Sequence, residues 1–147
     1  IPNDGYLLVS LSSGVSDEAH FYTGEAYRGA LGDSEAYAQS KLAITMWSFH
    51  LAQELGRDGA VIVAVNPASF LASKMVKDAY GMQGNDLSIG ADILVRAAVS
   101  EEFAGASGRY YDNDNRRFAD PHADAMDSEK NSKVVAAIEQ VISACSG

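Results

Sequence analysis

The chain has 147 residues, and 20 acidic against 11 basic residues give it a net charge of −9 at pH 7. Proteins bind nucleic acids and anionic membrane surfaces through a basic face, so this charge argues against both as partners. The length and the apolar content suit one domain with a core, and no apolar run approaches the ~20 residues of a membrane span.

The first predicted element is a strand from Tyr6 to Leu11 (YLLVSL), which ends at Ser12 and Ser13. A strand that is apolar along most of its length is typical of a parallel sheet buried on both faces. The long polar segment 14–32 follows it. Two interpretations of this segment stay open, the wall of a substrate site and an ordinary surface loop.

A long amphipathic helix is predicted in the stretch from Asp33 to Gly56, with Asp33 or Ser34 as its N-cap and Gly56 just past its end. Tyr37 and Lys41 lie one turn apart on it, so their side chains share one face. An ammonium fixed beside a phenol favours the phenolate, which makes proton exchange possible near neutral pH. Such a pair also arises by chance in many helices, as a surface aromatic beside a solvated lysine.

We expect the face that carries Tyr37 and Lys41 to continue onto the sheet. Its further members are Ile44, Ser48, Leu51 and Leu55, whereas Met46, Trp47 and Phe49 lie on other faces.

A second buried strand is predicted from Ala60 to Val65 (AVIVAV), closed by Asn66 and Pro67. Strand, long helix and strand make a βαβ unit, which predicts an α/β fold with parallel strands and a right-handed crossover. Chemistry in such sheets gathers at the carboxyl ends of the strands. We therefore expect Ser13, the start of the helix and the segment after Asn66 to face one crevice.

The remaining elements follow from the same rules. A short helix is predicted around Ser73 to Ala79, and a longer one runs through Val99 with Asp86 as its N-cap. Gly108 to Tyr111 is predicted as the last strand, at or near a sheet edge. The final helix covers 128–144, capped by Asp127 or Ser128.

The run from Asp112 to Asn115 (DNDN) invites a calcium interpretation, but Arg116 and Arg117 occupy positions where a calcium loop needs a ligand and a glycine. A surface turn is the better prediction, with the two arginines neutralising the carboxylates. The histidines and Cys145 have no metal-ligand spacing, so no metal site is predicted. A single cysteine excludes an internal disulfide, and we expect a cytoplasmic protein.

Three motifs together resemble the C-terminal half of the short-chain dehydrogenase/reductase family: the serine-ended strand, Tyr37-Ala38-Gln39-Ser40-Lys41, and Val65-Asn66-Pro67-Ala68. The resemblance covers about residues 5–127 and is strongest to the retinol-dehydrogenase-like branch. It implies the C-terminal part of a Rossmann-like, doubly wound parallel sheet with helices on both faces. Residues 1–147 would then be a single partial domain whose N-terminal dinucleotide-binding half is missing.

The resemblance also implies a division of roles. Tyr37 would be the general acid/base, Lys41 would favour its phenolate and hydrogen-bond the nicotinamide ribose, and Ser13, in preference to Ser12, would hold the substrate oxygen. The loop after the second strand would cover the nicotinamide of NAD or NADP. Its cofactor-binding candidates are Pro67, Ala68, Ser69 and Ser73.

The sequence departs from the family's pattern at three points that bear on cofactor binding. No glycine-rich turn of the pyrophosphate type occurs in the 147 residues. Ala68 stands where the family usually has glycine, and a positive φ there would strain an alanine. The family's loop threonine corresponds to Ser73 with about one extra residue, which leaves Ser69 as a rival.

Two functions are therefore expected. The first is hydride transfer between a nicotinamide cofactor and an alcohol or carbonyl substrate. The alternative is a non-catalytic truncated or degenerate fragment, inactive or serving as a binding module. The resemblance further implies a homo-oligomer through the apolar surplus of the long helix, or a complementing N-terminal half that covers it.

Overall fold

The computed structural model describes residues 8–11, 33–56, 59–69, 71, 81 and 86–146. Within them, a mixed sheet has the strand order β1-β2-β3-β4. The strands β1 to β3 run parallel and β4 pairs antiparallel with β3. Their bounds are Leu8–Leu11 for β1, Ile62–Asn66 for β2, Arg109–Asp112 for β3 and Arg117–Ala119 for β4.

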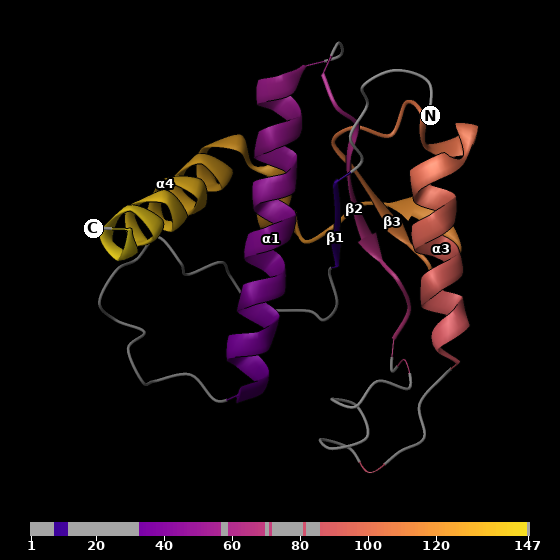
Figure 1. Cartoon of the computed structure of the whole chain (residues 1–147). Coiled ribbons are helices and arrows are strands. Elements are labelled where there is room, and N and C mark those ends of the chain that lie inside the picture. The colour runs from indigo at the N-terminus through magenta and orange to yellow at the C-terminus, as the bar shows by residue number, and fades with distance from the viewer. Residues whose placement is uncertain are drawn as a thin grey trace.

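The helices cover both faces of this sheet (Figure 1). α1 and α3 lie on opposite sides of the strands, and α4 packs against α1. Two short 3-10 helices, η2 and η3, precede β3 and α4. The bounds are Asp33–Leu55 for α1, Leu87–Val99 for α3, Glu101–Phe103 for η2, Ala123–Met126 for η3 and Ser128–Cys145 for α4.

The predicted βαβ unit is confirmed. β1 and β2 pair in parallel, with Leu8 opposite Ile62 and Leu11 opposite Val65, and α1 connects them. All five residues of β2 are buried, as expected for the central strand of a parallel sheet. α1 ends where Gly56 adopts a φ of 64° and its N–H donates to the Ala52 carbonyl at 3.2 Å.

The core on the α3 side of the sheet is built around three aromatic rings. Phe103, Tyr111 and Phe118 have centroids 5.1 to 5.2 Å apart in tilted and edge-on arrangements. Arg96 closes this cluster by donating to the Tyr111 hydroxyl and to Glu102. Burial alone would lower the pKa of Arg96, but these contacts outweigh it and raise that pKa. The remaining members of the core are Val63, Val65, Ile93, Ala97 and Ala106.

The predicted burial pattern of α1 is partly wrong. Ile44 and Leu55, expected to face the sheet, are 37% and 42% exposed, whereas Ser48 is buried as expected. Met46 and Phe49, assigned to other faces, are buried within the chain. The reason is that η3 and α4 cover a second side of α1, and Met46 packs there with Ala125 and Val134.

The strand predicted from Gly108 to Tyr111 is present as β3 and lies near the sheet edge, as expected. It is wrong as the last strand, because β4 follows it and forms the edge. Its chain reverses through a turn at 113–116 in which Arg116 has a φ of 52°, and β4 follows. The segment from Arg117 to Ala119 was too short to show a strand pattern.

The caps predicted for α3 and α4 are confirmed, whereas the side chains of Asp33 and Ser34, the candidates for α1, are not among those that the structure describes. The Asp86 side chain accepts the Ser88 N–H at 2.9 Å at the start of α3. Of the two candidates for α4, Asp127 is the cap, accepting from the N–H groups of Glu129 and Lys130. The short helix predicted around 73–79 lies outside the described residues. Among the described helices, none is long and apolar enough to cross a membrane.

Candidate functional site

The start of α1 and the end of β2 lie at the same edge of the sheet, the lower edge in Figure 1. Tyr37 and Lys41 stand in the first turns of α1. The Lys41 Nζ atom lies 5.3 Å from the centroid of the Tyr37 ring, and Tyr37 is 37% exposed. The predicted pairing of a phenol with an ammonium on one helix face is therefore present, and the phenol is accessible to solvent.

The other predicted site residues divide into two groups. Ser12, Ser13 and Ser73 lie outside the residues that the structure describes. Pro67, Ala68 and Ser69 follow β2 directly and are half-buried. The Tyr37–Lys41 pair and the segment after β2 therefore lie at the same edge of the sheet, the carboxyl edge of the parallel strands.

Asn66, the last residue of β2, joins this segment to the next strand. It is 7% exposed and pairs in register with Asp112 of β3. Its Nδ2 group donates to Asp112 Oδ1 at 3.3 Å and to Asp114 Oδ2 at 2.9 Å. Its buried Oδ1 atom has no hydrogen-bond partner in the described part of the chain.

Asp114, in the turn between β3 and β4, holds Ser69 at two points. The Ser69 N–H donates to Asp114 Oδ1 at 2.9 Å, and the Ser69 hydroxyl donates to Oδ2 at 2.6 Å. We call the set Asn66, Ser69 and Asp114 the Asp114 clamp. Burial alone would raise the pKa of Asp114, but the hydrogen bonds from Ser69 and Asn66 outweigh it and lower that pKa.

The rest of the turn supports the clamp. The Asn113 Nδ2 group donates to the Pro67 carbonyl at 2.7 Å. Asp112 accepts from the Asp114 N–H at 3.0 Å and from Asn115 Nδ2 at 2.6 Å. Both carboxylates of the turn are thus engaged by uncharged N–H and O–H donors.

This arrangement corrects the prediction that Arg116 and Arg117 neutralise the carboxylates. Among the described residues, neither arginine forms an ion pair with Asp112 or Asp114. Nor does the described part of the chain contain a group of His, Cys, Asp and Glu residues suited to a metal ion. The turn prediction itself is confirmed, but the turn contacts the candidate site rather than solvent alone.

Ala68 lies between the two anchored residues and has a φ of 147°. This is a backbone region that side chains rarely adopt, so the strain expected of an alanine at this position is present. The prediction rested on the contrast with glycine in the family that the chain resembles.

The sequence prediction did not identify Asp114 as part of the site. The available signal was its position: polar residues that follow β3 must lie beside those that follow β2 when the two strands are parallel neighbours. This signal could be used only once β2 and β3 were known to be neighbours in the sheet.

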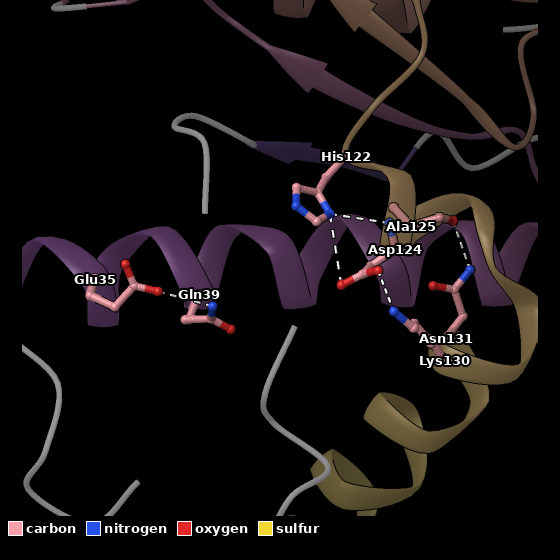
Figure 2. Close-up of polar contacts among 7 residues, drawn as sticks. All are labelled: Glu35, Gln39, His122, Asp124, Ala125, Lys130 and Asn131. Carbon is pink, nitrogen blue, oxygen red and sulfur yellow. Dashed lines mark hydrogen bonds and ion pairs between the residues drawn. The ribbon is translucent and has the colours of Figure 1, made fainter. Parts of the chain in front are cut away.

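A second polar cluster fastens η3 to α4 (Figure 2). Asp124 is buried, and its carboxylate accepts a hydrogen bond from Lys130 Nζ at 2.6 Å. The backbone N–H of Asp124 donates to His122 Nδ1 at 3.1 Å. Asn131 donates to the Ala125 carbonyl at 2.9 Å. Glu35 and Gln39 on α1 form a separate pair at 3.0 Å. We assign the η3–α4 cluster a structural role, because its polar groups hold these two elements together.

An open groove of about 430 Å³ lies between α1, η3 and the β3–β4 hairpin. Phe49 of α1 lines it, and this residue is about 18 Å along the helix from Tyr37. The groove is therefore separate from the edge that carries Tyr37. Its other lining residues are Gly108, Arg109, Tyr110, Arg117, Phe118, Ala119, Asp120, Pro121 and Met126.

Comparisons with protein-family models, with curated proteins and with solved structures found no match to this chain.

Proposed function

We propose that this chain is the C-terminal part of a Rossmann-like domain of the short-chain dehydrogenase/reductase type, which transfers a hydride between NAD or NADP and an alcohol or carbonyl substrate. The observation that supports it best is the accessible Tyr37 ring with Lys41 Nζ 5.3 Å from its centroid, at the carboxyl edge of parallel strands.

In this proposal Tyr37 exchanges a proton with the substrate oxygen, because a phenol exposed at the strand edge can reach a bound ligand. Lys41 holds its ammonium group beside the same ring, 5.3 Å from the ring centroid, and would hydrogen-bond the ribose of a bound nicotinamide cofactor. Ser13 would donate a hydrogen bond to the same substrate oxygen. The chain's own residues therefore supply orientation and one proton, which is the protein's usual share in cofactor-dependent hydride chemistry.

The segment after β2 fits a nicotinamide in part. A bound nicotinamide supplies the hydride transfer itself, and the segment from Pro67 to Ser69 would hold it. The Ser69 N–H and the Ser69 hydroxyl both donate hydrogen bonds to Asp114. This favours Ser73 over Ser69 as the serine that contacts the cofactor.

The test is a hydride-transfer assay on the full-length protein that contains this chain, with Tyr37→Phe beside the wild type. Loss of the positioned proton donor should lower kcat by about 10²- to 10⁴-fold. Tyr111→Phe is the matched control, since it deletes the same hydroxyl from the buried aromatic cluster on the α3 side. Equal turnover of Tyr37→Phe and the wild type would reject the role of Tyr37.

The second candidate is a non-catalytic fragment, favoured by the absence of a glycine-rich pyrophosphate turn from the 147 residues. Hydride transfer would need a further segment that supplies this turn. Titration of the 147-residue chain with NAD and NADP should accordingly show little binding. Micromolar affinity would mean that these residues hold the cofactor by themselves, and the missing-half part of the proposal would be wrong.

A further inference from the structure

The backbone after β2 is held by hydrogen bonds from the β3–β4 turn. Asn113 holds the Pro67 carbonyl, and Asp114 holds the Ser69 N–H and hydroxyl. The two anchored residues flank Ala68, whose φ of 147° costs free energy. A strained residue of this kind persists only where the surrounding contacts over-determine its conformation, and these bonds provide that determination.

The ionised carboxylate of Asp114 holds this backbone segment more firmly than a neutral side chain would. Its two oxygens accept three hydrogen bonds, from the Ser69 N–H, the Ser69 hydroxyl and Asn66 Nδ2. Hydrogen bonds to an ionised acceptor are about twice as strong as neutral ones. The Asn66 amide that joins the clamp is itself buried, so it cannot turn to water if Asp114 releases it.

We propose that Asp114 is a positioning residue, which fixes the Pro67–Ser69 backbone and through it the nicotinamide end of the cofactor site. The inference rests on the proposed function, because only there does this backbone contact a cofactor. It adds a residue from the β3–β4 turn to a site otherwise built from β1, α1 and β2. Asp114 acts through Ser69 and Ala68, without touching the reacting atoms.

Asp114→Asn is the sharpest variant, because it keeps the size of the side chain and removes one acceptor. If its amide nitrogen replaces Oδ1, it meets the Ser69 N–H, and if it replaces Oδ2, it meets the Asn66 amide. Either orientation sets two donors against each other. Asp120→Asn is the matched control, since Asp120 is an exposed carboxylate just after the same hairpin and lies outside the clamp.

The experiment has two readouts on the full-length protein. The first is the hydrogen-exchange rate of the Ser69 amide, which we expect to rise by roughly tenfold in Asp114→Asn and to stay unchanged in Asp120→Asn. The second is steady-state kinetics, in which KM for the nicotinamide cofactor should rise about 5- to 10-fold while kcat changes less than about twofold. Ser69→Ala keeps the N–H bond and should fall between the two.

The outcomes separate the inference from the proposed function. Unchanged exchange at Ser69 overturns the clamp itself. Faster exchange with an unchanged cofactor KM overturns the positioning role and leaves the clamp as a structural feature. Absence of hydride transfer in the wild type overturns the proposed function and the cofactor part of this inference together, while the exchange rate still decides whether Asp114 orders the loop.

Discussion

Ala68 is the residue at which backbone conformation and side chain conflict most directly. Its φ of 147° lies in a region accessible mainly to glycine, and such a residue costs about 1–3 kcal/mol. Replacing alanine by glycine also adds about 0.4–1 kcal/mol of unfolded-state entropy that folding must remove. The strain term is the larger of the two, so relief of strain should decide the sign.

We therefore expect Ala68→Gly to raise the free energy of unfolding by about 1 kcal/mol. The measurement is the urea midpoint at constant denaturant slope. Ala98→Gly is the matched control: Ala98 is exposed on α3, and glycine there should destabilise by about 1 kcal/mol. Two variants with the same chemical change should thus move the midpoint in opposite directions, and a lower midpoint for Ala68→Gly would contradict the strain argument.

Contacts between side chains could be predicted from the sequence where the two residues are close along the chain. Tyr37 and Lys41 are one turn apart on a helix, so their proximity followed from spacing alone. The contact of Asp114 with Ser69 joins residues 45 positions apart, and no local pattern carries it. Arg116 and Arg117 were assigned to the carboxylates because they are sequence neighbours. The actual donors are uncharged groups, some at the end of β2 and after it and others within the turn itself.

Among the secondary-structure elements, α4 provides a test of N-terminal capping by Asp127. The Asp127 carboxylate accepts the N–H groups of Glu129 and Lys130, whereas Ser128 is the first residue inside the helix. Asp127→Ala should lower the free energy of unfolding by about 1 kcal/mol, because both N–H groups lose their acceptor. Urea unfolding measures this, with Ser128→Ala as the control, expected within about 0.5 kcal/mol of the wild type. Equal losses in the two variants would mean that Asp127 is not the cap.

The elements themselves were predicted better than the faces they bury. The bounds of α1, Asp33–Leu55, agree closely with those expected, and Gly56 marks its C-terminal end. Its buried residues could not be derived from one apolar stripe, since the helix packs on the sheet and also on η3 and α4. The burial of Met46 depends on contacts with Ala125 and Val134, which are distant in sequence.

For the whole molecule, the sequence predicted the parallel α/β core and missed the hairpin that ends the sheet. Buried parallel strands have continuous apolar runs, and β2 shows one. β4 has only three residues, with an exposed arginine at its start, so its pairing with β3 depends on the turn before it. That hairpin is also what brings Asp114 to the candidate site.

Charge supplies a prediction at the scale of the whole molecule. At pH 7 the net charge of −9 repels itself within the folded chain, and lowering the pH toward the pI of about 4.6 removes this repulsion. Stability should therefore rise as the pH falls from 7 toward 5. About 0.5 M salt should raise the urea midpoint at pH 7 more than at pH 5, because it screens the same repulsion.

Below about pH 4 the sign reverses. The Ser88 N–H and hydroxyl lower the pKa of Asp86, and for Asp114 the hydrogen bonds from Ser69 and Asn66 outweigh burial and lower the pKa. A carboxyl whose folded pKa is depressed contributes stability that is present above its unfolded pKa of about 3.9 and is lost as the pH falls through the folded value. We therefore expect the urea midpoint to peak near pH 5 and to fall between about pH 4 and pH 2, with a shallower fall in Asp114→Asn. A midpoint that rises steadily from pH 5 to pH 7 would show that self-repulsion does not govern the stability of this fold, and an equally steep acid limb in Asp114→Asn would remove Asp114 from the groups that cause it.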